Sequence, residues 1–136
     1  MPPRFLGRTE DWLARAEASL ALARMIGPGV AMEDLCFQAQ QSAEKALKAI
    51  YVHRGIKFPF VHDLDLLLEG LEEQGCQVPQ SVDAASILTR YASETLYPGG
   101  FEPLTSVDHA QALALAEDVL AWVRVQVGMA GSGPSA

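Results

Sequence analysis

The sequence has no long apolar run, and this absence limits where the protein can work. No stretch approaches the roughly 20 consecutive apolar residues that a helix needs to cross a bilayer. The first residues, Met1-Pro2-Pro3-Arg4, lack the apolar core of a signal peptide. We therefore expect a soluble cytoplasmic protein that does not associate with membranes.

Cysteine and basic residues are also scarce. Cys36 and Cys76 stand alone without a CxxC pair, which is typical of reduced thiols, although the sequence leaves a bridge between them open. Ten Lys and Arg residues stand against 17 Asp and Glu residues, so the formal net charge is -7. Because nucleic-acid binding needs clustered cations, this balance argues against a dedicated DNA-binding protein and allows only a local basic groove.

Several catalytic and cofactor motifs are missing. The chain has no GxxxxGK[ST] or GxGxxG loop after a strand and no GxSxG elbow. His53, His62 and His109 are too far apart in the sequence for the usual metal-ligand spacing. The sequence therefore predicts neither a metal site nor a cofactor. It favours a non-catalytic role without deciding the question.

What the chain does have is helical periodicity. Apolar residues make up 49% of it, and a length of 136 residues fits one domain. Five amphipathic helices are predicted, with starts near Thr9, Met32, Asp63, Ser81 and Thr105 and with glycine or proline after their ends. Short connections between such helices predict an all-α, up-and-down bundle.

The chain is expected to divide into three parts. Residues 1–8 form an N-terminal extension, residues 9–127 the bundle, and residues 128–136 a tail of small residues that is expected to be disordered. The fourth helix should turn four residues toward the core: Ala84, Ile87, Leu88 and Tyr91.

The densest polar run lies inside the second predicted helix. Phe37, Gln41, Glu44 and Lys48 fall on one stripe, with Lys45 one position around the helix from it. Two interpretations stay open. The stripe is either a solvated face, on which Glu44 and Lys48 form a weak i,i+4 ion pair, or the floor of a polar groove that meets a ligand or partner.

Three further candidates lie downstream. His62 could be a general base, a phosphate contact or a packed capping residue. Arg90 suits a planar two-point contact with carboxylate or phosphate, or an ordinary ion pair. Tyr97, before Pro98, lies either at a corner that aims its ring inward or simply at a helix stop. The segment from Phe58 to Phe60 is expected to be a buried loop anchor.

These residues, taken in order, resemble the HEPN domain family over roughly residues 9–127. The matching elements are Gln41-x-x-Glu44-Lys45-x-x-Lys48-Ala49, Gly55, Pro59, His62-Asp63-Leu64, Leu67-Leu68, Tyr91 and Tyr97-Pro98. The resemblance implies a bundle of about five helices that forms a homodimer. It also implies one of two functions.

The first implied function is a non-catalytic subunit that binds a nucleotide, a minimal nucleotidyltransferase partner, or both, in an arrangement that could resemble a toxin–antitoxin pair. The second is a ribonuclease toxin with an Arg-x4–6-His motif. Here the positions five to seven residues after Arg90 hold Thr95, Leu96 and Tyr97, with no histidine. Leu96 also replaces the arginine that the family places before Tyr-Pro. The resemblance therefore favours the first function.

Two alternatives remain beside it. One is a ribonuclease with a non-standard active site that uses His62 as the base, so RNA as a ligand stays open. The other is a structural helical domain whose polar stripe only mediates dimerisation. The residues predicted to bind a ligand or partner are Gln41, Glu44, Lys45, Lys48, His62, Arg90 and Tyr97.

Overall fold

Helices form all the regular structure in the residues that can be described, 7–93 and 103–128 of a computed structural model. In chain order they are α1 (Thr9–Ala23), α2 (Met32–Arg54), α3 (Leu64–Glu73), α4 (Gln80–Asp83), the 3-10 helix η2 (Ala84–Ala92) and α5 (Ser106–Gln126). The predicted all-α bundle is confirmed. None of the helices within the described ranges combines the length and apolar composition that a membrane crossing requires.

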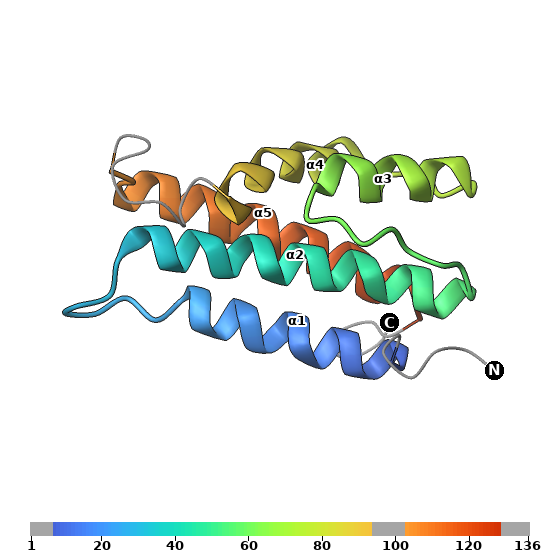
Figure 1. The fold of residues 1–136 in the computed structure, drawn as a ribbon, viewed down its shortest axis with the longest axis horizontal. Coiled ribbons are helices and arrows are strands. Elements are labelled where there is room, and N and C mark those ends of the chain that lie inside the picture. Colours follow the sequence, from blue (N-terminus) through green and yellow to red (C-terminus); the bar gives the residue numbers. More distant parts are fainter. Residues whose placement is uncertain (1–6, 94–102, 129–136) are drawn as a thin grey trace.

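Helix α2 occupies the centre of the bundle. Figure 1 shows α1 along one side of it, α3 and α4 along the other, and α5 behind. Alanines at the contacts let the helices approach closely, since Ala16, Ala43 and Ala46 are fully buried. The hydroxyl of Ser42 donates a hydrogen bond of 2.8 Å to the carbonyl of Ala16, which joins α2 directly to the backbone of α1. Residues on every side of α2 are therefore buried, polar ones included.

The predicted helix ends agree closely with the observed ones. Gly55, with φ of 69°, ends α2 in the left-handed conformation. The side chain of Asp63 caps α3 by accepting from the amide of Asp65 at 2.9 Å. Thr105 and Asp108 form the predicted capping box at the start of α5.

The fourth predicted helix is wrong in type. Only α4 is α-helical, and the chain continues as the 3-10 helix η2. The buried residues of this segment recur at every third position: Val82, Ala85, Leu88 and Tyr91. Because a 3-10 helix has three residues per turn, this spacing keeps them on one face, whereas Ala84 and Ile87 are exposed. The prediction had assumed the 3.6-residue period of an α-helix.

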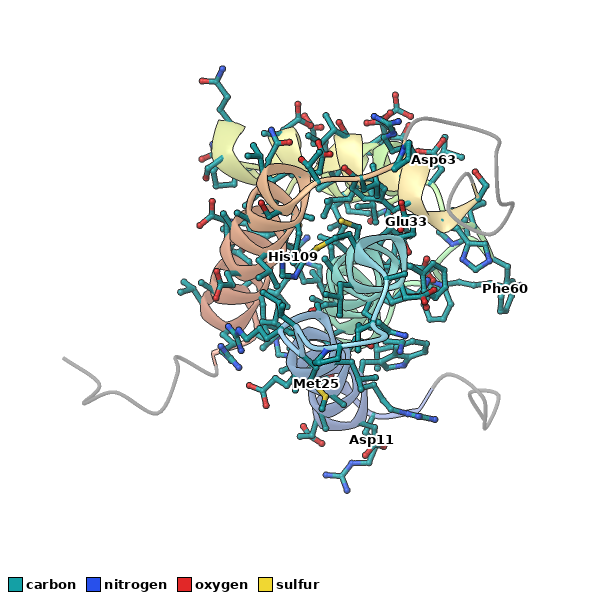
Figure 2. The ribbon with its side chains drawn as sticks, turned by 90° about the vertical axis from the view of Figure 1, so that its left-hand side faces the viewer. Asp11, Met25, Glu33, Phe60, Asp63 and His109 are labelled. Carbon is teal, nitrogen blue, oxygen red and sulfur yellow. The ribbon has the colours of Figure 1, made fainter. Side chains whose placement is uncertain are left out.

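Two buried hydrogen bonds link the outer helices to their neighbours. The Nε2 of His109 on α5 donates to the carbonyl of Ala23 at 2.6 Å, and Figure 2 shows His109 inside the bundle. The hydroxyl of Tyr51 donates to the carbonyl of Leu67 at 2.7 Å. A Cβ added at Gly70 would lie 2.1 Å from that hydroxyl, so α3 reaches α2 because residue 70 has no side chain.

Parts of the predictions fall outside the described residues. Tyr97 and Pro98 lie in residues 94–102, and the predicted tail lies in residues 129–136 apart from its first residue. Cys36 and Cys76 are both buried free thiols, as predicted. Burial raises the pKa of Cys36 to about 11, with smaller contributions from Asp108 and Glu33.

Candidate functional site

Five side chains of α2 and of the connection that follows it form one hydrogen-bonded cluster, called here the Glu44 network: Gln40, Gln41, Glu44, Lys48 and His62. Nζ of Lys48 lies 2.9 Å from Oε2 of Glu44, and Nδ1 of His62 lies 2.9 Å from Oε1. The amide of Gln40 donates to Oε1 of Glu44 at 3.1 Å and to the carbonyl of His62 at 3.0 Å. Gln41 completes the cluster by donating to Oε1 of Gln40 at 2.8 Å.

Burial decides how this cluster is understood. The side chains of Lys48 and Glu44 are only 9% and 6% exposed, so their ion pair is not on a solvated face. The rings of Phe58 and Trp12 lie beside Lys48, with centroids 5.1 and 5.9 Å from its Nζ. The interpretation as a solvated face is wrong for this pair, whereas the groove interpretation of the stripe stays a prediction.

The electrostatics of Glu44 follow from its partners. Burial alone would raise the pKa of this carboxyl. Hydrogen bonds from Lys48, His62 and Gln40 outweigh burial and hold the pKa of Glu44 below its ordinary value. In the described residues, no buried side-chain nitrogen or oxygen lacks a hydrogen-bond partner. Glu44 is therefore a stable anion whose charge is already neutralised within the protein.

His62 is the most exposed member of the network. Its side chain is 72% exposed, although Nδ1 is fixed on Glu44. An ionised carboxylate only accepts hydrogen bonds, so the Nδ1 atom of His62 carries a proton and donates it to Glu44. The other ring nitrogen, Nε2, does not take part in this hydrogen bond. The prediction of a buried anchor at Phe58 to Phe60 is correct only in part: Phe58 is 3% exposed, whereas Phe60 is 67% exposed and points away from the helices in Figure 2.

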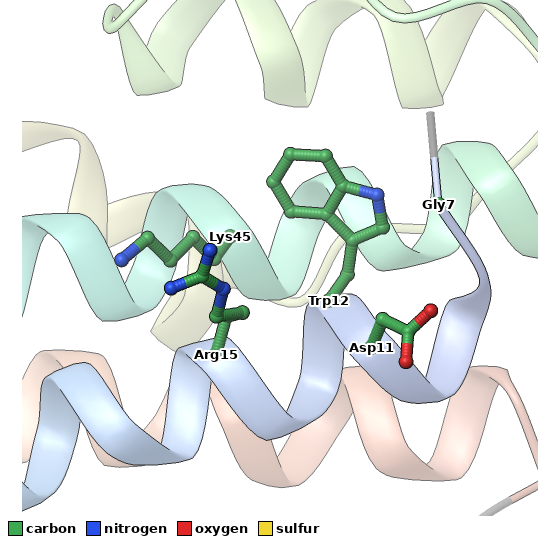
Figure 3. Close-up of a pocket in the computed structure, with 5 residues that line it drawn as sticks. All are labelled: Gly7, Asp11, Trp12, Arg15 and Lys45. Atoms are coloured by element: carbon green, nitrogen blue, oxygen red, sulfur yellow. The ribbon is translucent and has the colours of Figure 1, made fainter. Parts of the chain in front are cut away.

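Lys45 faces a different environment, although it follows Glu44 directly. It lines a pocket of about 400 Å³, called here the α1–α2 pocket, together with Gly7, which precedes α1, and with Asp11, Trp12 and Arg15 in its first turns. Figure 3 shows Lys45 and Arg15 on one side of the Trp12 ring and Asp11 on the other. The structure thus brings two cations, one carboxylate and an aromatic ring together in one hollow.

Neither cation of this pocket forms an ion pair with a carboxylate among the described residues, although Asp11 lines the same pocket. Nζ of Lys45 donates to the hydroxyl of Ser19 at 2.8 Å. Across the part of the chain that the structure describes, no carboxylate lies within ion-pair distance of Lys45 or Arg15. Burial lowers the pKa of Lys45, and the positive charge of Arg15 lowers it further, while the charge of Glu44 acts in the opposite direction. The pocket thus holds two cations and the one carboxylate of Asp11, a net positive lining.

Arg90 lies on η2, and the contacts described for it involve neither the Glu44 network nor the α1–α2 pocket. Its guanidinium is 5.6 Å from the centroid of the Tyr91 ring. It also contributes to lowering the pKa of Asp108, after the hydrogen bonds from Thr105. The predicted residues therefore separate into the Glu44 network, the pocket with Lys45, and Arg90, while Tyr97 lies outside the described residues.

Trp12 and Arg15 were not predicted as site residues. Trp12 lies in the first predicted helix, and nothing in the local sequence connects it with Lys45. The presence of an exposed arginine one turn from a tryptophan is the only signal that the sequence carried. Metal ligands are not gathered either: within residues 7–93 and 103–128, no three His, Cys, Asp or Glu side chains are placed to hold an ion.

Comparisons with known proteins agree with the sequence motif. The profile of the HEPN domain matches residues 9–126. The crystal structure of TT1696 from Thermus thermophilus is 32% identical, with a TM-score of 0.75, over 88% of this chain and 98% of that one. The structure of ST0689, an archaeal HEPN homologue, is 29% identical, with a TM-score of 0.73, over the same shares. No curated protein is significantly similar to the chain.

Proposed function

Since this chain belongs to the HEPN domain family, we propose that it is a non-catalytic subunit that binds a nucleotide and pairs with a minimal nucleotidyltransferase. The observation that carries the nucleotide part is the α1–α2 pocket, where Lys45 and Arg15 lie together and neither forms an ion pair with Asp11 or with another described carboxylate. A bound phosphate would neutralise both cations. The ring of Trp12 beside them offers a surface for a base.

The chemistry of the pocket suits a phosphate ester better than a simple carboxylate. The guanidinium of Arg15 can donate two parallel hydrogen bonds to phosphate oxygens, and the ammonium of Lys45 adds a point charge. Lys45 is half-buried, which strengthens its interaction because fewer water molecules compete there, whereas Arg15 is exposed. A flat base against Trp12 then adds stacking, which inorganic phosphate cannot provide.

Two observations support a non-catalytic role. Glu44, the carboxylate among the predicted site residues, is buried and paired with Lys48, so it is poorly placed to contact a substrate. The spacing Arg-x4–6-His of the ribonuclease members does not occur after Arg90. Neither the network nor the pocket therefore presents an unengaged acid and base side by side.

The nucleotide part is tested by calorimetric titration with ADP. Lys45→Ala and Arg15→Ala should each weaken binding roughly 10- to 100-fold, the usual loss when a hydrogen bond to a charged group is removed. The matched control is Lys57→Ala, which removes an exposed lysine outside the pocket and should leave the affinity unchanged. Equal affinity in all four proteins would contradict this assignment.

The partner part is tested by affinity capture from the native host. We expect a nucleotidyltransferase in a stoichiometric complex with this chain, as in a toxin–antitoxin-like pair. Recovery of the chain alone, as a homodimer or a monomer, would contradict the partnership. The proposed nucleotide binding would not be affected by that result, because the titration tests it separately.

A second candidate function rests on His62. Its Nδ1 is oriented by the carboxylate of Glu44 at 2.9 Å, the arrangement that prepares the other ring nitrogen to accept a proton. A ribonuclease that uses this base would cleave RNA in the wild type and lose cleavage in His62→Ala. Intact transfer RNA and structured RNA after incubation with the wild-type protein would remove this candidate.

A further inference from the structure

The two ends of the α1–α2 pocket carry opposite charges. Figure 3 shows Asp11 on the far side of Trp12 from Lys45 and Arg15. Asp11 and Arg15 are four residues apart on α1, a spacing at which opposite charges can pair, yet no ion pair of the described residues joins them. The pocket therefore has a cationic end and a carboxylate end.

The carboxylate of Asp11 can still accept hydrogen bonds from a ligand. Its Oδ2 accepts from the backbone amide of Arg8 at 3.2 Å, as part of the capping box of α1. Across residues 7–93 and 103–128, no other hydrogen bond to this carboxylate is found, so Oδ1 and one lone pair of Oδ2 are available.

Gly7 leaves room at this end of the pocket. A Cβ at residue 7 would lie 3.4 Å from Nε1 of Trp12 and 4.0 Å from Cβ of Asp11. A side chain at this position would therefore occupy the space beside the carboxylate. Because residue 7 is glycine, with φ of 65°, that space stays part of the pocket.

The opposite charges fix the direction in which a nucleotide can lie. Its phosphates must stay at the cationic end, because the carboxylate of Asp11 repels them. The ribose follows the phosphates, so the group that reaches Asp11 is the far edge of the base. A carboxylate only accepts hydrogen bonds, so it favours a base edge that carries two adjacent donors.

We propose that the α1–α2 pocket selects guanine nucleotides, with N1–H and the 2-amino group of guanine donating to the two oxygens of Asp11. This assignment rests on the proposed nucleotide site and names the base that the site takes. It gives Asp11 the role of a specificity-determining residue, beside the cations that bind the phosphates.

The other bases match this carboxylate less well. Adenine and cytosine each place an amino donor next to a ring nitrogen that accepts, and uracil places one N–H between two carbonyl oxygens. An acceptor that faces a carboxylate is repelled, so each of these bases loses at least one of the two hydrogen bonds. The hydrogen bonds to Asp11, and not contact with the ring of Trp12, thus set the preference.

The test is a calorimetric comparison of GDP with ADP, which have the same phosphates and sugar, on the full-length protein. GDP should bind roughly 10-fold more tightly, the lower end of the loss expected for a hydrogen bond to a charged group, because Asp11 is exposed. IDP lacks only the 2-amino group and should bind with intermediate affinity. The 2′-deoxy form of GDP should bind as GDP does, because the ribose hydroxyls do not contact Asp11.

The variant Asp11→Asn keeps the shape of the side chain and replaces one acceptor with a donor. Its affinity for GDP should fall to that for ADP. Its affinity for ADP should not fall, which also shows that the variant is folded. The matched control is Glu10→Gln, which removes the same charge from the same turn, outside the pocket, where Glu10 pairs with Arg8 at 2.8 Å. This control should keep the preference for GDP.

The outcomes separate the base preference from the site itself. Equal affinities for GDP and ADP in the wild type, or a preference that survives Asp11→Asn, would refute guanine selection while the pocket stands. Loss of the preference in Glu10→Gln, or a clearly weaker affinity for the 2′-deoxy form, would refute it as well, by assigning the effect to the charge of the helix end or to the ribose. If no nucleotide binds, the proposed nucleotide site fails, and the selection fails with it.

Discussion

Glu44 and Lys45 are adjacent on α2, yet they belong to regions of opposite character. Glu44 lies in a buried network where every charge has a partner, with Lys48 at 2.9 Å and His62 at 2.9 Å. Lys45 lies in an open pocket, where the cation of Arg15 repels it. A rotation of about 100° around the helix separates a network whose charges are paired from a pocket in which two cations meet one carboxylate, Asp11, without an ion pair to it.

The difference shows which polar residues are structural and which are available for binding. A buried ion pair that is fully hydrogen-bonded specifies how its surroundings pack, and it offers no position to a ligand. Two like charges in a pocket oppose folding, and a ligand that supplies the missing anion removes this repulsion. If the comparison is correct, changes in the Glu44 network should affect stability, and changes in the pocket should affect binding.

The largest effect is expected from Glu44→Gln. This variant keeps the shape of the side chain but leaves the ammonium of Lys48 buried without its counterion, which should cost about 3–5 kcal/mol of unfolding free energy. Urea denaturation of both proteins measures the loss. The double variant Glu44→Gln/Lys48→Met removes both charges and should recover most of the stability. A loss below about 1 kcal/mol in the single variant would contradict the structural role of the pair.

The next effect is a change in the pH dependence of stability. The folded-state pKa of Glu44 is lowered, so its ionised form stabilises the protein above the unfolded value near 4.5, and this contribution is lost as the pH falls through the folded value. The stability gap between the wild type and Glu44→Gln should therefore be largest near pH 7 and shrink below about pH 4.5. Denaturation curves at several pH values measure the gap, and a constant gap down to about pH 3 would be inconsistent with the prediction.

A smaller effect is expected from His62→Ala. The imidazole is 72% exposed, so its interaction with Glu44 competes with water and should contribute less than about 1 kcal/mol. Gln40 and Lys48 continue to satisfy Glu44 in this variant. Thermal denaturation should show a slight decrease in Tm, and the affinity for ADP should not change. A loss as large as that of Glu44→Gln would place His62 among the essential members of the network.

The smallest effect on stability is expected from Lys45→Ala. Removing one of two repelling cations should keep the unfolding free energy within about 0.5 kcal/mol of the wild type or raise it slightly. The variant also removes the donor to the buried hydroxyl of Ser19, and a helical serine can instead donate to a carbonyl of the preceding turn. Urea denaturation, with Lys57→Ala as the control, tests this. A clear destabilisation would mean that Lys45 is structural in the same way as Lys48.

Local sequence signals predicted most of the fold. The caps at Asp63 and Thr105 and the stop at Gly55 were readable because each depends on neighbouring residues alone. The spacing of Glu44 and Lys48 also predicted their pairing. The burial of that pair was not predictable, because Trp12 and Phe58 cover it from other parts of the chain.

The same limit applies to the pocket and to η2. Arg15 and Lys45 meet because α1 and α2 pack at one particular register, which no local pattern specifies. The 3-10 geometry of η2 places Ala85, Leu88 and Tyr91, which recur at three-residue spacing, on one buried face. In both cases tertiary packing selects among alternatives that the sequence leaves close in energy.

The most direct test of the contrast between the two regions is an ADP titration of two variants beside the wild type. Lys45→Ala should fold normally and lose most of its affinity. Glu44→Gln/Lys48→Met should bind ADP as the wild type does, since its substitutions lie in the network and not in the pocket. The opposite pattern, with binding retained in Lys45→Ala and lost in the double variant, would contradict the separation of a structural network from a binding pocket.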